Sequence, residues 1–541
     1  MGWHIAAGST EEYIRPVLHP LQFLDYSQPS LSAYRRWLQN KYSSVQVLNT
    51  SWKSEYVDFT DIPMPSLAER AYPMCGSLRD PDKEKHVLDF YEFYGDELAF
   101  FVWRLCMEGK RITDGKKLMG VFYGNISICT TELSHNSMNL LLQCDEIDFF
   151  ASPFCYTDNR GPAHDWPFQA TLESAHLHGK PWFVEADVRT FLSRPISQCM
   201  PYANPEVNKA YDGPVWLGPD TVEGSLGDML KAFSRILTHN AALWWFDMWG
   251  GWYDHEALMD FHRWAYPFYE NIVHNGRATP RAQLAVFIDE KALSGFSPRD
   301  SMAHAVCYQQ IVELGWLGAP YDCYLLSDFK AVDPTRYRMA MLLSPAGLTE
   351  GQRKHLAYWK KDGRTVLFTG YTSYFFGHMG EETDIAYEMS DSIVVLRANY
   401  GSEVYPEGTV SGPAIRLHPD AGDVPLSFDE TENPMAMLHR SSDYQTVWSI
   451  VPQVPCSIVR DMMLLSGAHI YCHSRDNVYA GGDLVIIHAC SKGVKRIFLP
   501  SIGKAYDVFT GERLPGTELW VEIEMQVGQT CMLRLELTPK K

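Results

Sequence analysis

The stretch KPWFVEADV (180–188) decides the fold, because it is an apolar, β-rich run that becomes polar at its C-terminal end. Amphipathic segments with apolar residues at three- and four-residue spacing lie between this run and others like it, as at 83–109. Strands that alternate with helices predict parallel βαβ units, and here a (β/α)8-type barrel. The similar runs are GWHIAA (2–7), KLMGVFYGN (117–125), EIDFFASPF (146–154) and AALWWFDMW (241–249).

A second unit is expected after GRATPRAQ (276–283), where glycine, proline and charge interrupt the pattern. Strands are predicted at 283–290 and 336–348, a helix at 304–321, and helix, turn and strand at 352–371. This pattern is typical of a doubly wound, flavodoxin- or glutamine-amidotransferase-like α/β domain. Short alternating strands from about 477 predict a small antiparallel β-domain. The expected domains are 1–277, 278–475 and 476–541.

Composition excludes several classes of partner. The formal net charge is −19, whereas nucleic acid and anionic membranes are bound by clustered lysine and arginine. No apolar run reaches the length of a membrane span, and the N-terminus lacks a signal peptide's features. Twelve scattered cysteines, with no CxxC pair or metal-like cluster, indicate reduced thiols. We therefore expect a cytoplasmic protein without metal or cofactor.

Aromatic residues favour carbohydrate as the substrate. The chain has 16 Trp and 29 Tyr, and several of them gather in LWWFDMWGGWYD (243–254). Sugar rings stack their apolar C–H faces on aromatic rings, while their hydroxyls need polar partners. Glycoside hydrolysis also needs two carboxylates, one as proton donor and one at the anomeric carbon. The candidates are Glu185, which ends the strand KPWFVE, and Glu12, which with Glu11 follows the first strand.

Residues 25–65 carry a specific motif. It consists of Tyr34, Arg35, Trp37, Leu38, Lys41, Tyr42, Leu48, Asn49 and Trp52. This spacing resembles the stretch that follows the acid/base glutamate in glycoside hydrolase family 42, the β-galactosidases. The order of barrel, α/β domain and small β-domain is similar to that family as well. The resemblance implies a retaining exo-β-glycosidase, most simply a β-galactosidase, that forms a trimer through residues 283–475.

The resemblance also implies roles for the two carboxylates. Such enzymes carry the acid/base at the end of barrel strand four and the nucleophile at the end of strand seven. Carried over, Glu12 is the acid/base and Glu185 the nucleophile, about 5 to 5.5 Å apart. Glu11 is the alternative acid, since the family's asparagine before the acid is absent here. The zinc-binding cysteines of some members are absent too, so the resemblance implies no metal.

Further residues at the expected carboxyl edge are candidate sugar contacts. A stacking platform is expected after the strand at 241–249, and hydroxyl contacts are expected after the strands at 117–125 and 146–154. The candidates are Tyr123, Asn125, Tyr156, Trp244, Asp247 and Trp252. His176 and His178 are expected to be structural.

Two alternatives remain open. The α/β domain could act as an amidotransferase, but its strand-to-helix turn has Ser344 and Pro345 where a nucleophilic cysteine is required. The chain could also be an inactive or truncated carbohydrate-binding relative. The strands found correspond to barrel strands four to eight, so we expect an open five-stranded sheet and little or no activity.

Overall fold

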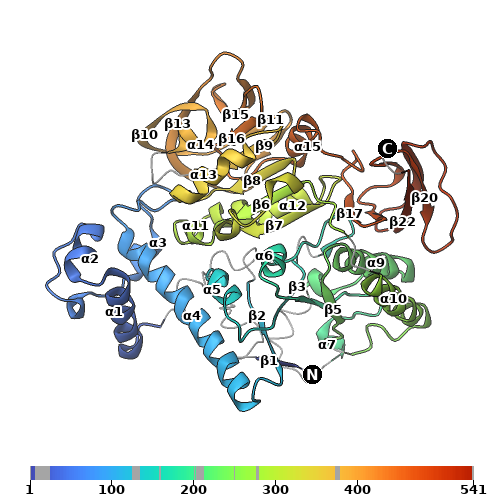
Figure 1. Ribbon diagram of the computed structural model, residues 1–541, viewed down its shortest axis with the longest axis horizontal. Coiled ribbons are helices and arrows are strands. Elements are labelled where there is room, and N and C mark those ends of the chain that lie inside the picture. Colours follow the sequence, from blue (N-terminus) through green and yellow to red (C-terminus); the bar gives the residue numbers. More distant parts are fainter. Residues whose placement is uncertain are drawn as a thin grey trace.

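We describe a computed structural model of the chain (Figure 1), which defines residues 2–5, 25–124, 135–156, 160–199, 202, 213–248, 250–275, 279–371 and 378–538. The first unit contains a parallel sheet in the order β1-β2-β3-β4-β5. Within the described residues β1 and β5 are its edges, so the sheet is the half barrel that the sequence predicts. The strands are β1 (Gly2–Ile5), β2 (Leu118–Phe122), β3 (Phe149–Pro153), β4 (Trp182–Ala186) and β5 (Ala242–Trp245).

Helices follow the strands as in βαβ units, and none of the described helices is long and apolar enough to cross a membrane. The longest, α4 (Lys85–Ile112), precedes β2, and α9 (Val222–Thr238) precedes β5. The Thr221 hydroxyl caps α9 by accepting a hydrogen bond from the Gly224 amide at 3.0 Å. The other helices are α5 (Met138–Leu142), α6 (Leu172–Leu177), α7 (Ile196–Cys199), η4 (Pro214–Trp216) and α10 (Glu256–His274).

The family-like motif builds a helical layer on α4. It forms α1 (Gln28–Tyr42) and α2 (Val45–Trp52), whose apolar motif residues are buried, except that Trp37 is half-buried. The Trp52 indole and the Lys41 ammonium both donate to the buried Asp89 of α4, at 2.8 and 3.1 Å. Burial opposes the charge on Asp89, but Lys85 and Lys41 outweigh it and hold its pKa below the usual value. The motif therefore specifies packing; η1 (Phe59–Asp61) and α3 (Leu67–Ala71) complete the layer.

The second unit contains a nine-stranded sheet in the order β12-β11-β14-β15-β16-β9-β8-β6-β7. Its parallel part is β7 (Tyr321–Leu325), β6 (Leu284–Ile288), β8 (Met339–Leu343), β9 (Thr365–Thr369) and β16 (Gln445–Ser449). The remaining strands are antiparallel: β11 (Ala398–Tyr400), β12 (Glu403–Tyr405), β14 (Val424–Phe428) and β15 (Pro434–Arg440). A separate ribbon pairs β10 (Ala386–Val395) with β13 (Ser411–His418).

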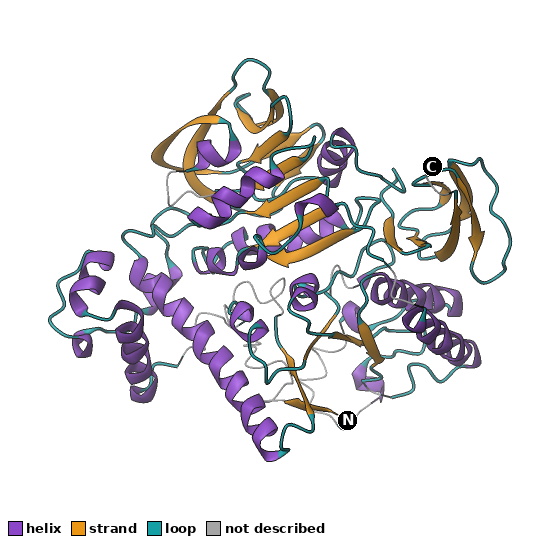
Figure 2. Ribbon diagram, viewed as in Figure 1, coloured by secondary structure: helices purple, strands orange, loops and turns teal. Residues whose placement is uncertain are grey.

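The sequence did not predict the four antiparallel strands, which extend the parallel part of this sheet, itself in the order β7-β6-β8-β9-β16. The helix predicted at 304–321 is also too long. Helical turns cover only His304–Gln309 (η5) and Gln310–Leu314 (α12), and β7 begins at Tyr321 after Pro320. Figure 2 shows helices flanking this sheet. They include α11 (Glu290–Ser294), α13 (Glu350–Trp359), α14 (Met379–Thr383) and α15 (Cys456–Leu465), and the short turns are η6 (Leu326–Asp328) and η7 (Pro334–Arg336).

The C-terminal unit is antiparallel, as the alternating pattern predicts. A four-stranded sheet has the order β17-β18-β22-β20, and β19 pairs with β21. Against this unit α9 packs closely: a Cβ on Gly227 would lie 2.2 Å from the Gly528 carbonyl oxygen. The strands are β17 (Asn477–Gly481), β18 (Leu484–His488), β19 (Gly493–Phe498), β20 (Gly503–Asp507), β21 (Trp520–Met525) and β22 (Thr530–Leu537). The two predicted domain boundaries, 277/278 and 475/476, stay predictions.

Candidate active site

Glu185 lies near the carboxyl end of β4, on the concave face of the half barrel. In register it is flanked by Pro153 of β3 and Trp244 of β5, and neighbours in register point to the same face of a sheet. The Trp244 ring lies 5.8 Å from the Phe122 ring of β2. Those strands are three positions apart, roughly 14 Å in a flat sheet. The rings meet because the sheet curves around them, which places Glu185 on the inner face.

The Glu185 side chain is largely buried, since the residue is only 8% exposed. A carboxylate is costly to bury unless it is paired or has a function. Its position beside Trp244, at the carboxyl edge of parallel strands, is where barrel enzymes place reacting groups. The arrangement can present a carboxylate and an indole face to the same ligand.

Asp187, two residues after Glu185, is the centre of a buried charged cluster that the sequence analysis missed. Its Oδ1 accepts from Arg160 Nη1 at 2.6 Å, and its Oδ2 accepts from Arg189 Nη1 at 2.7 Å. The Tyr156 hydroxyl donates to Oδ2 at 3.0 Å. Both guanidinium side chains are 3% exposed and the Asp187 carboxylate is fully buried. The cluster therefore ties together the segments that follow β3 and β4.

Aromatic rings surround these guanidiniums. Arg160 lies over the Tyr156 ring at 4.3 Å, and Arg189 lies over the Trp216 and Trp252 rings at 4.4 and 5.5 Å. Such contacts are favourable for a desolvated cation. Because Trp252 follows β5, these contacts also bring the segment after β5 to the cluster around Asp187. The sequence signal that could have indicated the cluster is the alternation of charge in Glu185, Asp187 and Arg189 at a strand end.

The structure places the other predicted site residues in several environments. Tyr123 is fully buried, its ring 4.5 Å from His135, and its hydroxyl accepts from the Ser137 amide at 3.3 Å. The Asp247 carboxylate accepts from the Trp252 amide at 3.2 Å, and Trp252 is 1% exposed. Trp244 and Tyr156 are half-buried at the carboxyl edge. Glu11, Glu12 and Asn125 lie outside the described residues.

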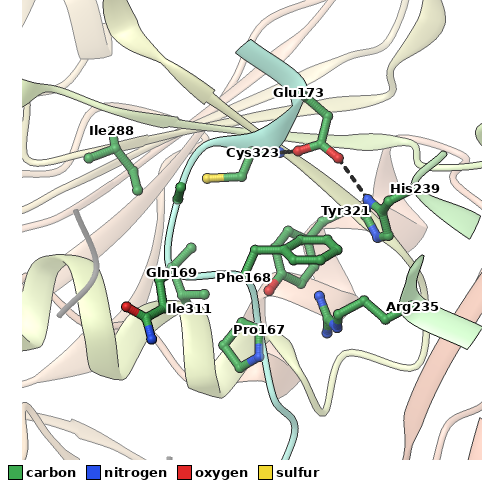
Figure 3. Close-up of a pocket in the computed structure, with 11 residues that line it drawn as sticks. Pro167, Phe168, Gln169, Glu173, Arg235, His239, Ile288, Ile311, Tyr321 and Cys323 are labelled. Carbon is green, nitrogen blue, oxygen red and sulfur yellow. Dashed lines mark hydrogen bonds and ion pairs between the residues drawn. The ribbon is translucent and has the colours of Figure 1, made fainter. Parts of the chain in front are cut away.

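A separate cavity lies between the barrel unit and the second unit (Figure 3). Its volume is about 20 Å³, room for about one water molecule, so it does not hold a sugar. On its wall His239 Nδ1 lies 2.7 Å from Glu173 Oε1, and the Cys323 amide donates to Glu173 Oε2 at 2.9 Å. A second contact between the two units joins His178 Nε2 to Asp328 Oδ1 at 2.9 Å. That histidine joins two units, in agreement with its expected structural role.

The same interface holds the one set of possible metal ligands among the described residues. Ligand atoms of Glu173, His239 and Asp322 lie within 4.8 Å of one another. Burial, reinforced by the charge on Glu173, raises the pKa of Asp322 to about 6. The Tyr337 hydroxyl donates to Asp322 at 2.6 Å. These direct hydrogen bonds account for the group without an ion.

The turn after β8 has the positive φ of a nucleophile elbow but lacks the cysteine that an amidotransferase requires. Ser344 has φ +42°, is buried, and its Oγ has no hydrogen-bond partner. The cysteine of an amidotransferase is absent from this turn, as the sequence shows.

A parallel half barrel with a buried glutamate at its carboxyl edge, followed by α/β and β units, has the architecture of a glycoside hydrolase. Residues 18–190 match the family model Glyco_hydro_42, described as beta-galactosidase. Residues 18–190 are thus similar to the glycoside hydrolase family 42 β-galactosidases. No curated protein matches the sequence.

Solved structures show the same fold. A cold-adapted β-galactosidase from Rahnella sp. R3 has a TM-score of 0.61 at 13% identity, covering 98% of this chain and 78% of that one. A β-galactosidase from Bacillus circulans sp. alkalophilus has 0.60 at 12% identity, covering 94% and 77%. A catalytic mutant of a β-galactosidase from G. stearothermophilus has 0.58 at 14% identity, covering 94% and 76%.

Proposed function

We propose that the protein is a retaining exo-β-glycosidase that removes terminal β-linked sugars, with β-galactosides as the first substrates to test. In the first step the Glu185 carboxylate attacks the anomeric carbon, and Glu12 donates its proton to the leaving glycosidic oxygen. In the second step Glu12 takes a proton from water, which attacks the anomeric carbon and releases Glu185. The sugar is released with its original configuration.

The observation that carries this proposal is the place of Glu185 on the concave face, in register with Trp244. Stacking of a sugar on the indole would present its anomeric carbon to the neighbouring carboxylate. The role of Glu12 rests on the family resemblance alone. Among the described candidates, Tyr123 and Trp252 are buried, whereas Trp244 and Tyr156 are half-buried.

The test is a panel of nitrophenyl β-glycosides. We expect release of nitrophenol from one or more of them, with β-galactoside among the best of the neutral sugars, and retention of configuration by NMR. The competing function is a carbohydrate-binding protein without turnover, favoured by the open five-stranded sheet. Binding of the same glycosides without release of nitrophenol would establish that function and contradict ours.

We also propose a homo-oligomer, most simply a trimer formed through residues 283–475. The ribbon of β10 and β13 supports an interface there, since Met389, Ile393 and Val395 are 42%, 45% and 60% exposed. Light scattering coupled to gel filtration should give about three times the chain mass of 61.7 kDa. A monomer at micromolar concentration would contradict the proposal.

A further inference from the structure

Arg160 and Arg189 hold the same carboxylate but differ in how completely their donors are used. Arg160 donates from Nη1 to Asp187, from Nε to the Cys155 carbonyl at 3.3 Å and from Nη2 to the Phe154 carbonyl at 3.0 Å. All three of its nitrogens are therefore satisfied. Arg160 is a structural member of the cluster.

Arg189, in contrast, uses only one nitrogen. Its Nη1 donates to the Asp187 carboxylate and to the Asp187 carbonyl, at 2.7 and 2.6 Å. Its Nε and Nη2 are buried and have no hydrogen-bond partner. Buried donors without partners are rare and costly, so an open pair on one guanidinium requires an explanation.

The open pair lies on one edge of the guanidinium. The guanidinium of Arg189 lies over the rings of Trp216, Tyr156 and Trp252, and Asp187 accepts from Nη1, which is not part of this edge. Nε and Nη2 form the edge that binds two oxygens of a planar or tetrahedral acid at once. Neutral hydroxyls can also accept hydrogen bonds from these donors, but they bring no counter-charge.

Charge within the cluster agrees with this geometry, since two guanidiniums share the single carboxylate of Asp187. Burial lowers the pKa of Arg189, and the charge of Asp187, which raises it, is opposed by that of Arg160, so the pKa stays below its usual value. An incoming acidic group would supply the missing counter-charge in a desolvated site, where such a pair is strong.

We infer that Arg189 is a specificity-determining residue, whose Nε–Nη2 edge binds a carboxylate or sulfate group on the sugar that Glu185 attacks. The inference rests on the proposed function for the identity of the reaction. The two residues are four positions apart, so their Cα atoms are separated by at most roughly 14 Å. A single sugar and the arginine side chain together can bridge that distance. The substrate class is then an acidic β-glycoside.

The experiment compares neutral and acidic nitrophenyl glycosides of one configuration: β-galactoside, β-galacturonide and sulfated β-galactosides. We expect kcat/KM to be roughly 10- to 100-fold higher for an acidic substrate. The galacturonide and sulfate arms identify which acid it is. Assays at about 0.15 M ionic strength screen the repulsion from the overall charge of −19.

Substitutions of Arg189 test whether the preference for acidic substrates depends on its Nε–Nη2 edge. Arg189→Met should reduce the ratio of acidic to neutral kcat/KM to about one. Arg189→Lys keeps the charge but lacks the two adjacent donors. Its ratio of acidic to neutral kcat/KM should lie between those of the wild-type protein and Arg189→Met. Arg263→Met, an exposed arginine on α10, is the matched control. An unchanged ratio in Arg189→Met, or no preference in the wild-type protein, would overturn the inference.

A binding measurement separates this inference from the proposed function. Calorimetric titration of Glu185→Gln with methyl β-galactoside, methyl β-galacturonide and a sulfated methyl β-galactoside needs no turnover. Tighter binding of one acidic glycoside, lost in Glu185→Gln/Arg189→Met, supports the inference even where hydrolysis fails. Equal binding of neutral and acidic glycosides overturns it even where neutral glycosides are hydrolysed. Thermal unfolding of each variant checks that the fold is retained.

Discussion

Replacing Glu185 by alanine should lower kcat/KM on the best nitrophenyl glycoside by roughly 10³-fold or more, without unfolding the protein. The residue supplies the attacking oxygen, and removal of a nucleophile eliminates the covalent step. Because the truncation leaves space beside the anomeric carbon, azide should restore part of the turnover and yield a glycosyl azide of inverted configuration. Initial rates with and without azide measure both effects.

The matched control is Glu108→Ala. Glu108 is exposed in the last turn of α4, where it pairs with Arg111. This end of α4 lies on the side of the sheet at which β2 begins. Its loss should leave kcat/KM within about twofold, because an exposed pair of this kind contributes little. Near-normal activity of Glu185→Ala would remove the nucleophile assignment and with it the proposed mechanism.

The largest effect on stability is expected for Asp165→Ala. Asp165 is fully buried, pairs with Arg235 of α9, and accepts from the Tyr479 hydroxyl of β17 at 2.6 Å. Burial opposes its charge, but Arg235 outweighs burial and keeps its pKa below the usual value. Removing the carboxylate leaves a buried guanidinium without its counter-charge. The free energy of unfolding should fall by about 3–5 kcal/mol.

Chemical denaturation of the wild-type protein and of Asp260→Ala provides the comparison. Asp260 pairs with Arg263 on the exposed side of α10, where both side chains are more than 60% exposed. That substitution should cost less than about 1 kcal/mol. A loss below about 1 kcal/mol in Asp165→Ala would mean that the contact between α9 and the C-terminal unit does not depend on this ion pair.

Much of the fold could be predicted from the sequence, because the buried parallel strands are continuous apolar runs. FFASP in β3 and WFVEA in β4 stand out against the polar segments around them. The antiparallel part of the second unit was missed for the opposite reason. Strand β10 is exposed over nearly its whole length, and β12 has three residues. Such strands are defined by their pairing partners, not by their own pattern.

The candidate site likewise has a part that the sequence predicts and a part that it does not. The proximity of Glu185 and Trp244 could be predicted from the sequence, because parallel strands end at one edge of the sheet. The contacts of Asp187 with Arg160 and Arg189 could not, because they depend on how the segments after β3 and β4 fold back. The position of Tyr123 after a strand predicts a sugar contact, but in the structure its ring packs on His135 in the core.

The most direct test of the central claim is to trap the covalent intermediate. The protein is incubated with a 2-deoxy-2-fluoro glycoside of the sugar that the panel identifies, bearing a good leaving group, and is then digested and analysed by mass spectrometry. We predict one fluoroglycosyl group per chain, attached to Glu185, and no label in Glu185→Ala. Hydrolysis with inversion of configuration and no adduct, or an adduct on another residue, would contradict the account.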